Sequence, residues 1–169
     1  TCALPIWGII GLGTIGRRVA GIAEAFGCKV QYYSTSGNNH ADDVKEVSFD
    51  ELLATSDIIS IHAPLNDKTE GLINAKALSK MKKSAVLINV GRGPIICEKD
   101  LMDALNNGVI RAAGLDVLSE EPMSKSSPFL GFKDSDRLFI TPHIAWASLE
   151  ARTRLMKTIE EQIREFFGL

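Results

Sequence analysis

Residues 7–16, WGIIGLGTIG, join a short apolar run to the glycine pattern GxGxxG at 11–16. In that pattern the first glycine permits a tight turn, the second lets a pyrophosphate approach the backbone, and the third allows close helix packing. The apolar run predicts a strand, and the spacing of Ile15, Val19 and Ile22 predicts a helix over 14–26. Because the N–H groups at a helix start attract anions, the stretch predicts a dinucleotide site.

The remaining chain alternates β-branched runs with helical segments. Strands are predicted at 7–10, 29–33, 58–62, 85–89, 112–116 and 138–141, and helices at 14–26, 49–55, 75–81, 98–105 and from 149 onward. Ser48, Asn74 and Ser148 are the predicted N-caps, and 119–136 is a predicted surface loop. This order predicts an α/β fold with a doubly wound parallel sheet of the Rossmann type, in three α/β/α layers.

Ligands of such a sheet bind at the carboxyl ends of its strands. The residues that follow the predicted strands are therefore the candidates for a site. They are 11–16, Ser34, Ala63 and Pro64, 90–92, Asp116 and His143.

Composition narrows the function classes. The 169 residues carry a formal charge of -2, which gives no basic field for nucleic acid, and no apolar run is long enough for a membrane span. Three cysteines without metal-ligand spacing predict neither a disulfide framework nor a metal site and favour a reducing, cytoplasmic location. Whatever the chain binds is therefore expected to be bound locally.

The choice between NAD and NADP stays open. The end of the second strand reads Tyr33-Ser34-Thr35-Ser36, without the acidic residue that usually holds the ribose 2′-hydroxyl. A carboxylate would repel a 2′-phosphate, so its absence removes that barrier. The only bases close by in the sequence are His40 and Lys45, and a solvated turn with no selective role is an equal alternative.

Arg92 lies between two glycines directly after a buried strand, in NVGRGP at 89–94. It could be a surface arginine in a tight turn. Its planar fork of donors also suits a substrate carboxylate, and the flanking glycines would let a small substrate come close. Its position at a strand end favours the second interpretation.

Two acids and a histidine follow the last two strands. Asp116 and Glu121 would by charge alone be solvated loop acids, and a lone histidine is more often structural than catalytic. His143 differs because a carboxylate and an arginine from other strand ends could converge on it. His40 and His62 have no such company and are expected to be a loop residue and a strand residue.

Together, GLGTIG, NVGRGP, GLDVLSEEP and TPHIAWAS resemble the D-isomer-specific 2-hydroxyacid dehydrogenase family, in the family's order and over nearly the whole chain. The resemblance implies three catalytic residues: Arg92, Glu121 and His143. It implies an NAD(P)-binding set comprising Gly11, Gly13, Thr14, Ile15, Gly16, Ser34, Ala63, Pro64, Thr69, Val90 and Asp116, the last at the nicotinamide carboxamide.

The implied chemistry is hydride transfer between nicotinamide C4 and C2 of a 2-keto or D-2-hydroxy acid. His143 would donate the proton, Glu121 would orient its ring and favour its charged form, and Arg92 would hold the carboxylate and polarise the carbonyl. Residues 145–147, AWA, resemble the glycerate dehydrogenase, or hydroxypyruvate reductase, branch. That branch implies hydroxypyruvate or glyoxylate as the keto acid.

Family members place a substrate domain before this cofactor domain, and many are dimers. We therefore expect a fragment of a homodimeric enzyme that is inactive when isolated, with the cofactor domain at 7–147 and a helix at 148–169 that returns to the missing domain. Residues 1–6 do not fit the family's linker helix and are expected to be a non-native leader, the alternative being a natural linker. A dinucleotide-sensing corepressor without turnover is the alternative function.

Overall fold

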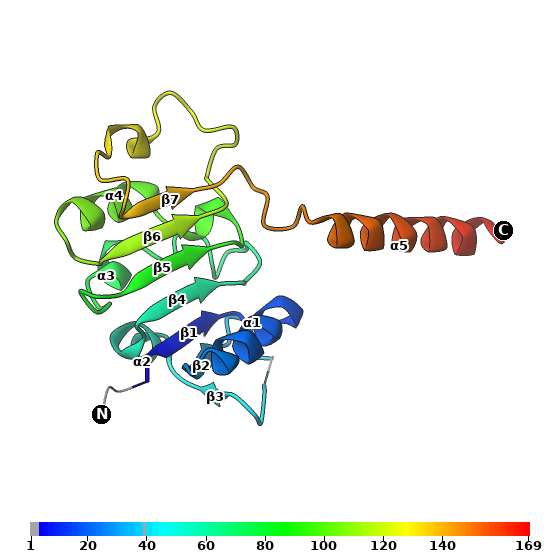
Figure 1. Cartoon of the computed structure of the whole chain (residues 1–169), viewed down its shortest axis with the longest axis horizontal. Helices are drawn as coiled ribbons and strands as arrows, with labels where there is room; N and C mark the ends of the chain where they lie inside the picture. Colours follow the sequence, from blue (N-terminus) through cyan, green and yellow to red (C-terminus); the bar gives the residue numbers. More distant parts are fainter. Residues whose placement is uncertain (1–3, 39) are drawn as a thin grey trace.

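Seven parallel strands form one sheet in the order β3-β2-β1-β4-β5-β6-β7 (Figure 1). The computed structural model describes residues 4–38 and 40–169. The strands are β1 Ile6–Ile10, β2 Lys29–Tyr33, β3 Lys45–Glu46, β4 Ile58–Ile61, β5 Val86–Asn89, β6 Ala112–Leu115 and β7 Leu138–Ile140. The order runs outward from β1 in both directions, so the predicted doubly wound fold is confirmed.

Strand β1 lies near the middle of the sheet and pairs with β2 on one side and β4 on the other. Trp7 is in register with Val30 and with Ile58. Because every pair is parallel, the carboxyl ends of all strands share one edge of the sheet. The segments that follow the strands therefore meet at that edge, as expected.

Four of the helices connect strands, and the fifth follows the last strand. They are α1 Thr14–Ala25, α2 Phe49–Thr55, α3 Ala75–Leu78, α4 Glu98–Asn106 and α5 Leu149–Phe167, with short 3-10 helices η1 Gly93–Ile95 and η2 Pro128–Gly131. The three predicted N-caps are confirmed, because each side-chain oxygen accepts a backbone N–H of the first turn at 3.2 Å. These caps are Ser48, Asn74 and Ser148.

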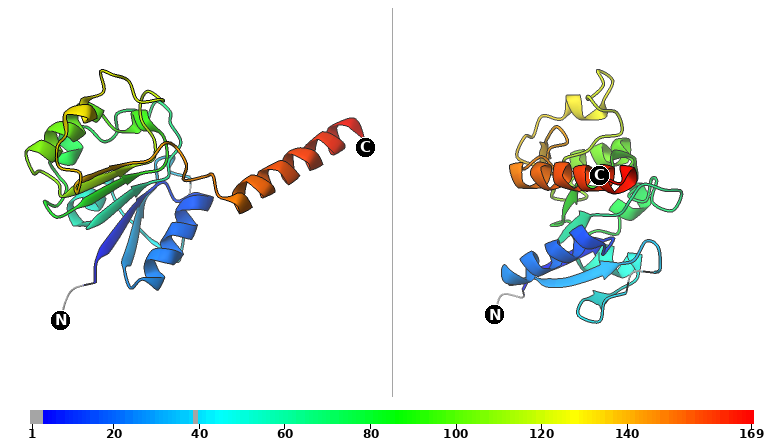
Figure 2. Two further views of the ribbon diagram at one scale, coloured as in Figure 1. Left: turned by 45° about the horizontal axis from the view of Figure 1, so that its top comes forward. Right: turned by 90° about the vertical axis from the view of Figure 1, so that its right-hand side faces the viewer.

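Helix α1 packs on one face of the sheet, and α2, α3 and α4 pack on the other (Figure 2). The larger apolar core lies beneath α2, α3 and α4 and includes Leu52, Leu87 and Leu101, whereas the smaller core includes Ile9 and Ala20. Residues of β5 and β6 alternate between buried and partly exposed. The face of these strands on the side of α1 is therefore less covered than the face beneath α3 and α4.

Three local predictions were incomplete. Strand β3 was not among the predicted strands, because a two-residue edge strand of Lys45 and Glu46 has no apolar pattern. Helix α3 ends at Leu78 and not at Met81, since the N–H of Met81 bonds three residues back in a tighter turn. The predicted surface loop 119–136 contains η2, which the buried Phe129 ties to the core.

The amino-terminal strand begins one residue earlier than expected. Ile6 belongs to β1, and its N–H donates to the Asp57 carboxylate at 2.9 Å. The carbonyl of Pro5 accepts the N–H of Lys29 at 2.9 Å. Of the segment expected to be a leader, residues 1–3 lie outside the described residues.

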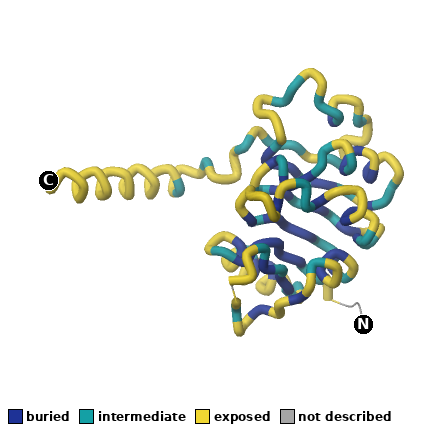
Figure 3. The backbone as a smooth tube through the Cα atoms, turned by 180° about the vertical axis from the view of Figure 1, so that it is seen from behind, coloured by how far each residue is buried: buried dark blue, intermediate teal, exposed yellow. Residues whose placement is uncertain are grey.

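Helix α5 extends away from the sheet, and none of its residues is buried (Figures 1 and 3). Its apolar side chains, including Leu155, Ile159 and Phe166, are exposed. Over residues 4–38 and 40–169, we find no helix with the combined length and apolarity that a membrane crossing needs.

Candidate active site

The glycine turn between β1 and α1 has the geometry that a dinucleotide requires. Gly11 has a φ of +91°, and a Cβ there would lie 2.8 Å from the backbone nitrogen of Ala63. A Cβ on Gly16 would overlap the carbonyl oxygen of Gly11, whereas one on Gly13 would meet nothing within 4 Å. The first and third glycines therefore allow close packing, and the second leaves open space over the backbone.

The start of α1 adds a favourable charge to that space. Its N-cap is Gly13, with no side-chain cap, and its first turn contains no acidic residue. The N–H groups of this turn are therefore available to an anion, and the helix dipole favours negative charge there. The turn fits the pyrophosphate of NAD or NADP.

Ser34 follows β2, where the adenosine ribose of such a cofactor lies. Its side chain is buried, and its Oγ accepts the N–H of Gly37 at 3.1 Å. The two bases named from the sequence are both paired with acids: His40 with Glu46 at 2.9 Å and Lys45 with Glu51 at 2.8 Å.

Arg17 is a further base near this end of the sheet, and it was not among the residues singled out from the sequence. It lies on α1, and its guanidinium donates to the carbonyl of His40 at 2.9 Å in the loop after β2. It also lies 3.7 Å from Asp43. The contact depends on how α1 packs beside that loop, which spacing along the chain does not reveal.

Replacing Ser34 by Asp is expected to reduce the affinity for NADPH relative to NADH about tenfold or more. A carboxylate at this strand end accepts ribose hydroxyls and repels a 2′-phosphate. Fluorescence titration with each cofactor measures the ratio. Ser36→Asp, which places the same charge on an exposed residue of the same loop, is the matched control. Equal losses for both cofactors in Ser34→Asp would contradict the expectation.

A cavity of about 440 Å³ lies at the carboxyl ends of β4 and β5. Five of the predicted site residues line it together: Ile15, Ala63, Pro64, Val90 and Arg92. His62, Leu65 and Gly91 complete the lining. His62, expected to be a strand residue, follows the last residue of β4 and lines this cavity.

Thr69 shapes the loop beside this cavity. It is fully buried, and its Oγ1 donates to the carbonyl of Pro64 at 2.7 Å and accepts the N–H of Asn66 at 2.9 Å. Its hydroxyl is therefore used within the 64–69 turn. Thr69 therefore holds the carbonyl of Pro64 in place through this hydrogen bond.

Asn89 fixes the turn that carries Arg92. It is buried, its Nδ2 donates to the carbonyl of Arg92 at 2.9 Å, and its Oδ1 accepts the N–H of Gly91 at 3.0 Å. The Arg92 side chain is exposed, and its guanidinium donates to the carbonyl of Gly91 at 2.8 Å. The sequence did not identify Asn89, because its role depends on the backbone of Gly91 and Arg92 folding back to reach its side chain.

The two glycines beside Arg92 have a packing role that the sequence did not predict. We expected them to give a small substrate room to approach. A Cβ on Gly91 would lie 3.1 Å from the carbonyl oxygen of Ala63, and one on Gly93 would overlap the backbone of Leu118. Gly93 therefore joins the Arg92 segment to the loop that carries Glu121.

Gly93→Ala is expected to lower the free energy of unfolding by about 1–3 kcal/mol, because the added methyl meets a backbone carbonyl that cannot rotate away. Urea unfolding followed by circular dichroism measures this change. Gly131→Ala is the matched control, since a Cβ at Gly131 would meet nothing within 4 Å. Equal stability of the two variants would show that Gly93 does not pack as described.

His143 and Glu121 form a close pair at the carboxyl end of the sheet. The Nδ1 of His143 lies 2.7 Å from Oε2 of Glu121, and both side chains are a little over one-third exposed. The other oxygen of Glu121 accepts the N–H of Leu118 at 2.9 Å. This N–H, followed by the His143 ring, lowers the pKa of Glu121, so the carboxylate stays ionised at neutral pH.

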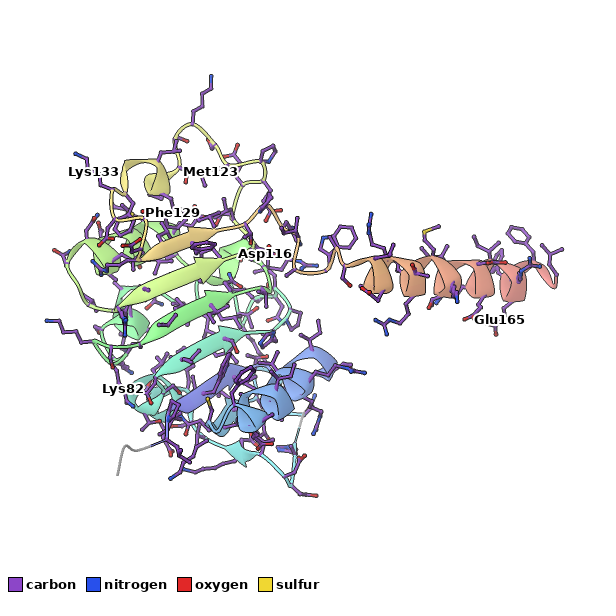
Figure 4. All side chains as sticks on the ribbon, viewed as in Figure 1. Lys82, Asp116, Met123, Phe129, Lys133 and Glu165 are labelled. Carbon is purple, nitrogen blue, oxygen red and sulfur yellow. The ribbon has the colours of Figure 1, made fainter. Side chains whose placement is uncertain are left out.

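Asp116 lies directly after β6 (Figure 4). Its Oδ1 accepts the Thr141 hydroxyl and the N–H of Ile144, and its Oδ2 accepts the N–H of Ala145. Burial raises the pKa of Asp116, but these hydrogen bonds outweigh burial and hold it below its ordinary value. Asp116, Glu121 and His143 line one cavity of about 220 Å³ together with Leu118, Met123 and residues 140–142.

The predicted catalytic residues thus lie around two cavities. Arg92 lines the cavity of β4 and β5, whereas Glu121 and His143 line the other. The segments that line the two cavities contact each other, because β5 pairs with β6 and Gly93 packs against Leu118. Within the described ranges no cluster of three or more His, Cys, Asp or Glu side chains is arranged for a metal ion.

Comparison with known proteins gives a consistent result. Residues 5–145 match the family described as D-isomer specific 2-hydroxyacid dehydrogenase, NAD binding domain. Hydroxypyruvate reductase of Blautia hydrogenotrophica is 45% identical over 161 residues, which are 94% of this chain and 49% of that protein. The chain therefore spans about half the length of the curated relatives it matches.

Two solved structures are also similar to this chain. A glyoxylate reductase from Paecilomyes thermophila superposes with a TM-score of 0.85 at 37% identity, covering 95% of this chain and 48% of that one. An acyclic imino acid reductase in complex with NADPH and D-Arg gives 0.88 at 40% identity, covering 97% and 51%.

Proposed function

This chain belongs to the D-isomer-specific 2-hydroxyacid dehydrogenases and carries their NAD-binding domain, and on that basis we propose that the whole protein reduces a 2-keto acid to the D-2-hydroxy acid and catalyses the reverse oxidation. The proposed keto acids are hydroxypyruvate and glyoxylate, with D-glycerate and glycolate as products. The names of two similar proteins, a hydroxypyruvate reductase and a glyoxylate reductase, support this choice. The observation that carries the proposal is the His143–Glu121 pair beside a sheet edge that fits a dinucleotide.

His143 is the proposed proton donor. Its Nδ1 is held by Glu121, which leaves Nε2 to face the oxygen of the reacting carbonyl. The carboxylate of Glu121, ionised at neutral pH, fixes the orientation of the His143 ring. On reduction His143 gives its proton to the oxygen at C2, and on oxidation it takes that proton back.

Arg92 is proposed to bind the substrate carboxylate. Its guanidinium is exposed at the cavity of β4 and β5, on a turn that Asn89 fixes. Two parallel N–H donors match a carboxylate and would also polarise the neighbouring carbonyl. This contact would set the orientation of C2.

The cofactor contacts are proposed along the same sheet edge. Gly11, Gly13 and Gly16 would admit the pyrophosphate at the start of α1, with Thr14 and Ile15 beside it, and Ser34 would lie at the ribose. Ala63, Pro64 and Val90 would line the path toward the nicotinamide, with Thr69 behind Pro64 and Asp116 at the carboxamide. When bound, the nicotinamide supplies or accepts the hydride.

We also propose how the chain is divided. Residues 7–147 would form the cofactor domain, and 148–169 would pack against the substrate half of the whole protein. The exposed apolar side of α5 supports this division, because an isolated helix of this kind gains stability only by packing. For the whole protein we propose a homodimer in the cytoplasm, which sedimentation and cell fractionation would test.

Turnover by the whole protein tests the proposed function. Consumption of NADH or NADPH should depend on added hydroxypyruvate or glyoxylate, and the product should be the D-enantiomer wherever C2 is chiral. Binding of the cofactor with no turnover of any 2-keto acid would contradict the proposal and favour a binding module. The chain of 169 residues alone is expected to bind cofactor without turnover, because the other half is needed to close the cleft.

A further inference from the structure

His143 has an unusual backbone conformation. Its φ is 52°, and it is the non-glycine residue with a positive φ within the described part of the chain. A side chain in this region costs free energy and persists when neighbouring groups fix the backbone. The turn that carries His143 must therefore be held by specific contacts.

Asp116 supplies those contacts on both sides of His143. Before the histidine, its Oδ1 accepts the Thr141 hydroxyl at 2.6 Å. After it, Oδ1 accepts the N–H of Ile144 at 2.9 Å and Oδ2 accepts the N–H of Ala145 at 2.8 Å. The carbonyl of Asp116 also accepts the N–H of His143 at 2.8 Å. One residue thus binds four groups of the turn.

Trp146 holds the remaining backbone group of His143. Its indole N–H donates to the carbonyl of His143 at 2.8 Å, although the side chain is largely exposed. The N–H and the carbonyl of His143 are therefore both engaged, the first by Asp116 and the second by Trp146.

The capacity of Asp116 is largely used within the turn. Its side chain is only 6% exposed, and three donors already approach its two oxygens. A carboxylate so arranged is suited to fixing a backbone, whether or not it also meets a cofactor.

We propose that Asp116 is a positioning residue that fixes the His143 turn, with Trp146 as its second support, so that the ring is delivered to Glu121 in the absence of cofactor. This inference rests on the proposed role of His143 as proton donor. It assigns to Asp116 a role distinct from contact with the nicotinamide.

Asp116→Asn separates these two roles. The amide oxygen can keep the Thr141 and Ile144 donors, but its NH₂ then faces the N–H of Ala145, so two donors oppose each other. In the cofactor-free chain we expect the imidazole NMR signals of His143 to lose the signature of the Glu121 hydrogen bond. In a Trp7→Phe background, the emission of Trp146 should shift to longer wavelength.

Asp136→Asn, on an exposed loop acid, should leave both spectra unchanged. The inference would be overturned if the cofactor-free spectra of Asp116→Asn were identical to wild type and only the dissociation constant for NADH or NADPH increased. Asp116 would then be a cofactor contact. If Asp116→Asn does not fold, Thr141→Val decides, because it removes one donor and should shift both spectra in the same direction, less strongly.

In the whole protein, Asp116→Asn should lower kcat about tenfold or more with little change in the KM of the keto acid. Failure of the proposed function can be told apart from failure of this inference. In that case the wild-type protein would lack turnover, while the cofactor-free spectra would still respond to Asp116→Asn.

Discussion

Replacing His143 by Gln should lower the kcat of the whole protein by roughly 10²- to 10⁴-fold, the usual contribution of a positioned general acid. Gln can still hydrogen-bond Glu121, but it carries no proton that can be transferred at neutral pH. Cofactor affinity should change little, because His143 lies with Glu121 around the cavity after β6 and β7 and not at the glycine turn. Initial rates and cofactor titrations on the same preparation separate the two effects.

Lys133→Gln is the control for this change. Lys133 is exposed in the loop before β7 and points away from the sheet (Figure 4). Its replacement should leave kcat unchanged. A His143→Gln enzyme that keeps more than about one-tenth of the wild-type rate would mean that another group supplies the proton.

Much of the fold follows from local pattern. Six of the seven strands were predicted within one or two residues, because buried parallel strands are short β-branched runs bounded by turns. The exception, β3, has no such signal: Lys45 and Glu46 pair with β2 only because the chain returns beside that edge. The burial of Phe129 is likewise decided by what lies beneath the loop.

The site was predictable to the extent that it lies at strand ends. The sequence placed Arg92, Glu121 and His143 there, and the resemblance to a family gave them roles. Asn89 and Trp146 were missed because their partners are backbone groups of a folded turn. The packing role of the glycines beside Arg92 was missed, since the neighbour of Gly93 comes from a distant loop.

His62 was also missed, and its burial predicts a large dependence of stability on pH. Its Nε2 lies 3.0 Å from the hydroxyl of Ser60, which accepts the indole N–H of Trp7. Its Nδ1 is buried without a hydrogen-bond partner among the described residues. Burial lowers the pKa of His62 from 6.5 to about 4.

The direction of this pH dependence follows from the difference between the pKa of His62 in the unfolded chain and in the folded chain. Between pH 6.5 and about 4 the unfolded chain binds a proton at His62 that the folded chain does not. Stability therefore falls as the pH falls through this interval, by roughly 3 kcal/mol in total and about 2 kcal/mol between about pH 7 and about pH 5. Above the unfolded pKa the group contributes no pH dependence, and below the folded pKa the loss is complete.

Urea unfolding of His62→Gln against pH isolates this contribution, because the variant should lose most of the slope between about pH 7 and about pH 5. His40→Gln is the matched control with the opposite sign: Glu46 raises the pKa of the exposed His40, so its stabilisation is present at acid pH and lost as the pH rises. Removing His40 should therefore leave the acid slope intact or steeper. An unchanged slope in His62→Gln would mean that water reaches the Nδ1 of His62, and that the cavity beside Arg92 is more polar than its lining indicates.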